Sequence, residues 1–162
     1  MSVQVVLELA TAEVLHLAAL LRQFLELLDD TAPGTGDDPG IARLVPDAYP
    51  DDAEASRDFR SVTRGELLGR RRDDAQGILA QLATLTELDA DPTTLDDGGP
   101  EIAVVLEPDG VGAWLRTLTA LRLVIATRLG ITTEDGHDPS DPRYGIYDWL
   151  GVRLDGLVRA VS

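Results

Sequence analysis

The fold of this chain is decided by residues 3–28, which read VQVVLELATAEVLHLAALLRQFLELL. Apolar and polar side chains alternate over residues 3–9, apart from Val6, and this two-residue period is typical of a half-buried strand. From Thr11 onward the apolar residues follow the 3.6-residue period of a helix, so we predict an N-cap at Thr11 and a helix over about 12–28. Leucines cover so much of its circumference that this helix must be packed on several sides.

A second strand is predicted at residues 101–107, where β-branched side chains cluster. This run repeats at 104–107 the VVLE of residues 5–8, and it also leads into a long apolar helix, here about 109–129 ending at Gly130. A short strand without a partner leaves backbone groups unsatisfied, so we expect the two strands to pair with each other.

Further helices are predicted from capping signals and apolar spacing. One short helix is expected at about 41–45. A helical stretch from about Ala55 is predicted to bend at the capping box of residues 63–66, and a new helix then reaches residues 85–88. The last helix is expected at about 146–161. Inward positions in these helices include Ala75, Ile78, Leu82, Leu85, Ile146, Leu150, Leu157 and Val161.

Together these elements predict a single mainly α domain over residues 1–162. It combines a helical bundle-like core with a small two-stranded β-sheet, the strands lying near 3–9 and 101–107. The most apolar helices are expected to meet in one core that contains Leu21, Phe24, Leu118, Leu121, Ile125, Trp149 and Leu150.

The composition narrows the class of function. The net charge is −15, from 29 acidic and 14 basic residues, and this excess disfavours nucleic acid and anionic membranes as partners. The chain has no cysteine, which excludes disulfides and thiolate chemistry. No secretory signal pattern or membrane-spanning stretch is recognised, so a cytoplasmic location is expected. Every basic residue is an arginine, which suggests a GC-rich genome such as that of an actinobacterium.

The most unusual feature is an arginine-rich stretch, residues 57–72, in a very acidic chain. Its guanidinium groups could grip the carboxylates or phosphates of a partner, and Arg60 and Arg64 are our candidates for such contacts. The competing interpretation is an internal network of ion pairs with the chain's own acids, including Asp73 and Asp74.

Arg122 lies among apolar residues of its predicted helix, so we expect it to be withdrawn from water. A buried guanidinium needs an acidic partner, and the candidates are the Asp29–Asp30 pair and Asp148. We interpret this arginine mainly as a structural clamp and keep it as a candidate binding residue.

Aromatic residues suggest a third kind of site. A small-ligand pocket could lie under Tyr49, Tyr144 and Trp149, and we count Tyr49, Tyr147 and Trp149 among the candidate binding residues.

Metal and catalytic sites are not supported by the sequence. Acids and His137 gather in residues 134–141, but their spacing matches no calcium loop and is explained by Asp-Pro turns. His16 could be a proton donor in a pocket, but it is better explained as a packed or helix-flank histidine. With few serines and no nucleophile-elbow motif, we predict no catalytic residues, no metal and no cofactor.

Several short motifs resemble the uncharacterised, mainly actinobacterial domain-of-unknown-function family twenty-seventeen. These motifs are RLVPDAY at 43–49, Asp51-Asp52, Phe59-Arg60, Trp114, LRL at 121–123 and YGIYDWL at 144–150. The family has no assigned activity, so the resemblance carries over no site residues. Its genes often lie beside that of the adaptor of the Clp protease, which implies a link to regulated proteolysis.

These observations favour a non-enzymatic, cytoplasmic interaction or regulatory protein with a protein partner; partner identity and oligomeric state stay open. The alternatives are a hydrolase or metal-dependent enzyme using the 134–141 loop, and a small-ligand binder.

Overall fold

The computed structural model describes residues 4–29, 44, 53–88, 90–91, 94–131, 140–141 and 144–161, with residues 53–64 and 96 described by their backbone alone. The elements in chain order are β1 (Val5–Ala10), α1 (Thr11–Asp29), α3 (Ala53–Leu85), the 3₁₀ turn η2 (Asp96–Gly98), β2 (Glu101–Leu106), α4 (Pro108–Leu129) and α5 (Gly145–Val161). The predicted mainly helical fold with one small sheet is confirmed.

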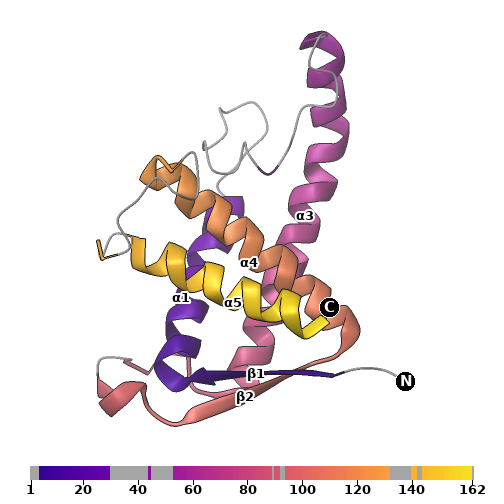
Figure 1. Ribbon diagram of the computed structural model, residues 1–162. Coiled ribbons are helices and arrows are strands. Elements are labelled where there is room, and N and C mark those ends of the chain that lie inside the picture. The colour runs from indigo at the N-terminus through magenta and orange to yellow at the C-terminus, as the bar shows by residue number, and fades with distance from the viewer. Residues whose placement is uncertain are drawn as a thin grey trace.

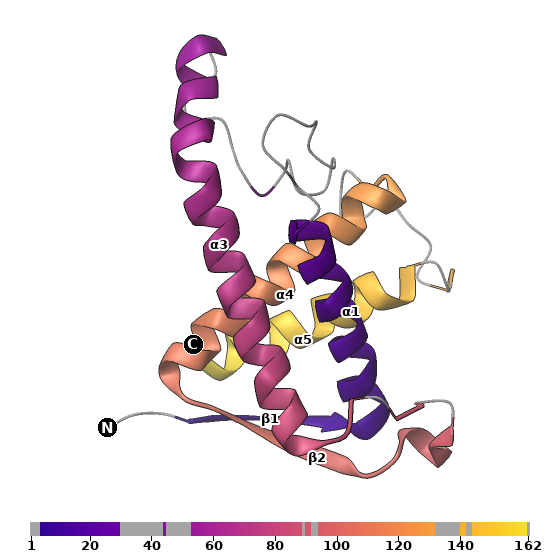
Figure 2. The same ribbon diagram turned by 180° about the vertical axis from the view of Figure 1, so that it is seen from behind.

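The helices form two layers that cross each other above the sheet (Figures 1 and 2). Helices α1 and α3 lie side by side in one layer, and α4 and α5 pack together in the other. The N-terminal turns of α3 extend beyond the remaining helices (Figure 1). Among the described residues, none of the helices is long and apolar enough to span a membrane.

The two strands pair with each other in an antiparallel sheet, as predicted. Their register sets Val6 opposite Val105, and side chains alternate so that Val5, Leu9 and Val104 are buried against the helices. The two copies of the VVLE repeat, residues 5–8 and 104–107, lie symmetrically about this pair. A local two-fold axis at the Val6–Val105 pair therefore relates residues 5–8 to residues 104–107.

Helix α1 begins directly at the end of β1, with a different cap from the predicted one. The Thr11 hydroxyl does not cap the helix but donates to the Pro100 carbonyl, at 2.6 Å, because β2 starts alongside. The cap comes from Glu13, whose Oε1 accepts the Ala10 N–H at 3.1 Å. This bond is the carboxylate half of a capping box.

Helix α3 is one continuous helix, so the predicted bend at residues 63–66 is wrong. A capping box promotes a helix start only where the preceding turn is not helical; here the preceding residues are helical, and Ala53–Leu85 contains no proline to interrupt the hydrogen bonds. The predicted helix at 41–45 lies outside the described residues, apart from Leu44.

Helix α4 ends as predicted, at Gly130, whose φ of 74° is in the left-handed region. The N–H of Ile131 donates to the Ala126 carbonyl at 2.9 Å and that of Gly130 to the Thr127 carbonyl at 3.2 Å. This pair of bonds is a Schellman motif, which satisfies carbonyls that the helix end leaves free.

The predicted core is confirmed. Five of its seven members are buried in one cluster and the other two, Ile125 and Trp149, are partly buried against it. Three inward assignments are wrong: Leu85 is 40% exposed, Ile146 48% and Val161 51%. All three lie at helix ends, where the neighbouring elements no longer cover the apolar face.

Candidate functional site

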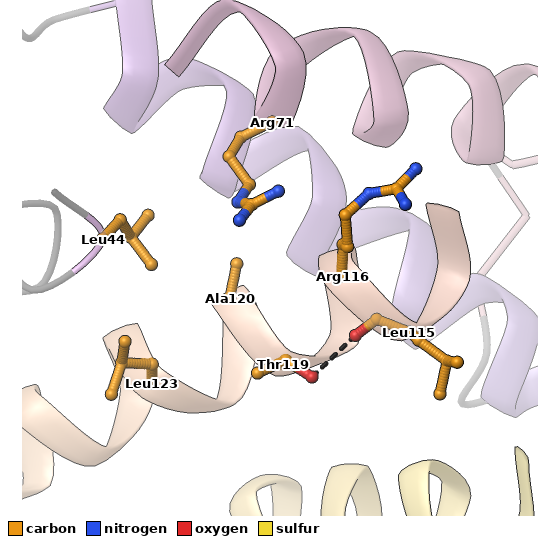
Figure 3. A pocket seen from close by; sticks show the side chains of 7 residues that line it. All are labelled: Leu44, Arg71, Leu115, Arg116, Thr119, Ala120 and Leu123. Carbon is orange, nitrogen blue, oxygen red and sulfur yellow. Dashed lines mark hydrogen bonds between the residues drawn. The ribbon is translucent and has the colours of Figure 1, made fainter. Parts of the chain in front are cut away.

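A pocket of about 360 Å³ lies between α3 and α4 (Figure 3). We call it the α3–α4 groove. Two rows of α4 side chains line it at helical spacing, together with one arginine of α3 and one leucine from outside the helices. The lining residues are Leu44, Arg71, Leu115, Arg116, Thr119, Ala120 and Leu123. The small side chain of Ala120, opposite Arg71, leaves room between the helices (Figure 3).

Arg116 crosses the groove and is held by an acid of α3. Its Nε lies 3.0 Å from Asp74 Oδ2 and its Nη2 lies 3.4 Å from Oδ1, a bidentate contact. This hydrogen bonding raises the pKa of Arg116 above its ordinary value, although burial acts in the opposite direction. Gly112 gives the guanidinium room, because a Cβ there would lie 3.1 Å from Arg116 Nη1.

Arg71 is half-buried, and its guanidinium points into the groove toward Ala120 (Figure 3). Its neighbour Arg72 forms an ion pair with Asp29, across to α1. In the described part of the chain, by contrast, no carboxylate pairs with Arg71. A half-buried guanidinium without an acid is unusual in a chain with 29 acids and 14 bases.

Among the described residues, the lining of the groove consists of apolar side chains, one threonine and two arginines, without a histidine or carboxylate. The nearby Asp74 is engaged by Arg116. The Thr119 hydroxyl donates to the Leu115 carbonyl of its own helix at 2.6 Å (Figure 3). What remains is an apolar floor with two guanidinium groups, which suits an anionic ligand that also carries apolar groups.

Two predicted binding residues, Arg122 and Tyr147, meet where α4 packs on α5. The Arg122 Cζ lies 4.0 Å from the centre of the Tyr147 ring, and its Nε donates to the Tyr147 carbonyl at 3.3 Å. The guanidinium also lies against Gly151. Arg122 is half-buried rather than largely buried, because the α4–α5 surface around it, which Asp148 also lines, is open on one side. These contacts, with an aromatic ring and a backbone carbonyl, link α4 to α5.

Trp149, a third predicted residue, belongs to a separate polar cluster. Its Nε1 donates to Glu13 Oε2 at 2.6 Å, and Arg153 Nη2 donates to the same oxygen at 2.5 Å. Partial burial raises the pKa of Glu13, but the hydrogen bonds from Trp149, Ala10 and Arg153 outweigh it, so the net pKa lies below its ordinary value. This cluster fastens α5 to the start of α1.

The structure describes two of the three aromatic residues of the predicted pocket, Tyr144 and Trp149, and these two pack in different clusters. Tyr144 packs in a small cluster with Ala126 and Ile131, whereas Trp149 packs on the main core. Tyr49 lies outside the described residues, as do the side chains of Arg60 and Arg64.

The 134–141 loop is described only at Ser140 and Asp141, so the structure leaves its metal and enzyme interpretations untested. Among the described residues, no three histidine or acidic side chains gather in a way that could hold a metal ion. His16 is exposed on α1, which agrees with the helix-flank alternative and not with the packed one.

Sequence reasoning singled out the arginine-rich stretch but not Arg71 within it, and it missed Arg116 entirely. Helical spacing does place Arg116, Ala120 and Leu123 on one face. The sequence, however, does not show that Asp74 pairs with Arg116 and not with Arg71, because this pairing depends on how α3 crosses α4.

The fold and the groove define a mainly helical domain with a two-stranded sheet and a cationic groove between two helices. A family model described as Domain of unknown function (DUF2017) matches residues 2–161, and the chain belongs to this family. Neither a curated protein nor a solved structure matches the chain.

Proposed function

We propose that this chain is a non-enzymatic interaction protein that holds an acidic segment of a partner protein in the α3–α4 groove. The observation that carries the proposal is Arg71, a half-buried guanidinium that points into the groove with no carboxylate partner in the described part of the chain. An incoming carboxylate would supply the missing partner, with two parallel hydrogen bonds.

The rest of the groove suits a peptide better than a free anion. Leu115, Ala120 and Leu123 offer an apolar floor on which aliphatic side chains can pack. The favoured ligand is therefore a segment in which aspartate or glutamate alternates with leucine-like residues at helical spacing. Because Arg116 is already engaged by Asp74, Arg71 provides the main electrostatic contact.

The proposal also includes a cytoplasmic location and a role in regulated proteolysis, which do not depend on the groove. A cytoplasmic location agrees with the lack of cysteine, since the fold does not depend on an oxidising compartment. A role in regulated proteolysis follows from the family resemblance alone and stays a prediction. The enzyme alternative gains no support from the groove, where none of the described lining residues is a general acid or base.

The groove is tested by replacing Arg71 and, as a matched control, its exposed neighbour Arg70, which does not line the groove. The probes are fluorescein-labelled 12-residue helical peptides that combine glutamate and leucine, and the same peptides with lysine for glutamate. Binding is measured by fluorescence anisotropy at low and high salt.

We expect the glutamate peptides to bind more tightly than the lysine peptides, and salt to weaken them. Arg71→Gln should raise Kd by about tenfold or more, because a charged contact in a partly buried site is lost. Arg70→Gln should change Kd by less than about twofold. Equal binding of both peptide sets, or equal effects of both variants, would contradict the proposal.

A further inference from the structure

In the described part of the chain, helices α1, α3, α4 and α5 all lie on one side of the sheet and leave its outer face uncovered (Figures 1 and 2). Alternation and register place four cross-strand pairs on this face. Three are paired in the ladder: Val6 with Val105, Glu8 with Ala103, and Ala10 with Glu101. The fourth pair, Gln4 with Glu107, lies just beyond the ladder and is joined by a side-chain hydrogen bond. We call these eight residues the outer sheet face.

The centre of the outer sheet face is apolar and open to solvent. Val6 is 54% exposed and Val105 is 46% exposed, and the two lie directly opposite each other. Solvent-facing positions of a half-buried sheet are usually polar. The two facing, exposed valines thus form a small apolar patch.

Acidic side chains surround this patch. Glu8, Glu101 and Glu107 are all exposed, and none of the eight residues of the face is basic. Gln4 Nε2 donates to Glu107 Oε1 at 2.7 Å, which orients this carboxylate and leaves it acceptor capacity. The face is therefore an apolar centre within a negative border.

The local two-fold axis arranges the charges symmetrically. It passes through the Val6–Val105 pair and relates Glu8 to Glu107, two residues away along each strand and in opposite directions. Strand geometry separates these two glutamates by roughly 13 Å along the sheet and one strand spacing of about 4.8 Å across it.

We propose that the outer sheet face is a second docking surface, which binds an extended segment of a partner protein with the pattern basic–x–apolar–x–basic. In an extended chain these three side chains point to the same side, and the two basic residues are about 13 Å apart. The apolar residue then covers Val6 and Val105, and each basic residue meets one glutamate. This surface is separate from the α3–α4 groove and does not depend on it.

A second copy of this chain is a poorer occupant. Two copies stacked face to face would bring the glutamates of both molecules together around the valines, in a protein whose net charge is already −15. Charge complementarity therefore favours a cationic segment.

The test uses isotope-labelled protein titrated with the peptide GRTVTRG, followed by amide chemical shifts. Controls are the isomeric peptide GRVTTRG, which moves valine to the opposite side, and GETVTEG, which reverses the charges. The variant Glu8→Gln/Glu107→Gln removes the two symmetric charges. Its matched control, Glu26→Gln/Glu66→Gln, removes two exposed charges from helices.

The proposal expects shifts confined to residues 4–8 and 103–107. It expects Kd to rise at least fivefold in the Glu8/Glu107 variant and less than 1.5-fold in the control variant, with weaker binding of both control peptides. Shifts elsewhere, or equal effects of the two double variants, would overturn it. A concentration-dependent dimer in light scattering that Val6→Asp abolishes would overturn it too, since the face would then bind a second copy.

Discussion

At the scale of single residues, Gly151 sets how closely Arg122 approaches α5. A Cβ on Gly151 would lie 2.9 Å from Arg122 Nη2 and 3.1 Å from its Cζ. Gly156, one and a half turns further along the same helix, has no atom within 4 Å of such a Cβ. Replacing Gly156 by alanine therefore changes helix propensity alone, whereas the same replacement at Gly151 also disturbs the contact with Arg122.

Gly156→Ala should raise the free energy of unfolding by about 0.5–1 kcal/mol, because alanine is the better helix former. Gly151→Ala should gain about 1 kcal/mol less, since Arg122 must leave the Tyr147 ring to make room. Urea denaturation of both variants measures the difference. In an Arg122→Met background the two alanines should become equivalent; equal gains in the parent protein would show that the stacking contributes nothing.

Glu13 couples the stability of the protein to pH. Its folded-state pKa lies below the ordinary value of 4.5, so its ionised form stabilises the native state above that pH. This stabilisation is lost as the pH falls through the lower, folded-state pKa. At neutral pH we expect Glu13→Gln to cost about 1.5–3 kcal/mol, the range for hydrogen bonds to a charged group.

Urea denaturation between pH 3 and 7 checks this prediction. The difference between parent and Glu13→Gln should stay constant down to about pH 5 and shrink below pH 4.5. Glu26→Gln, an exposed position on the same helix, is the control and should change little. A difference that persists undiminished at the lowest pH would mean that the charge of Glu13 is not what stabilises the native state.

At the scale of elements, the register of α3 determines which of its leucines matter. Leu82 is fully buried in the main core, whereas Leu85, at the end of the helix, is 40% exposed. Leu82→Ala should therefore cost about 2–5 kcal/mol, the range for a buried leucine that leaves a cavity. Leu85→Ala should cost less than about 1 kcal/mol. Thermal and urea denaturation compare the two, and similar losses would show that the α3 register is wrong.

The elements were predictable wherever one periodic pattern persisted. Strand β1 and helices α1, α4 and α5 follow an apolar period, broken in β1 only at Val6, and β2 follows from its β-branched cluster. The bounds of these elements agree with the predictions to within about two residues. The continuity of α3 through residues 63–66 was not predictable, because these four residues are compatible both with a helix start and with a helix interior. The exposed helix ends, such as Val161, depend on where neighbouring elements stop, which no local pattern contains.

At the scale of the whole molecule, the net charge of −15 conceals two local surfaces of opposite character. The α3–α4 groove carries two guanidinium groups, and the outer sheet face is bordered by three glutamates. The composition gives only the net charge of the whole chain, which disfavours nucleic acid as a partner. It could not locate either surface. Both arise from contacts between elements: the Asp74–Arg116 pair in the groove, and the strand register in the sheet.

The sheet also bears on how the chain is made. Strand β1 is synthesised before its partner β2, which follows only after residues 11–100. At about 5–20 residues per second, β1 waits roughly 5–20 s on the ribosome without a hydrogen-bonding partner. Helices α1 and α3 can pair in the meantime, because both are complete before β2 exists. Nascent chains that end before residue 101 therefore lack the strand with which β1 pairs. The unpaired backbone groups of β1 then favour aggregation, which chaperones counteract.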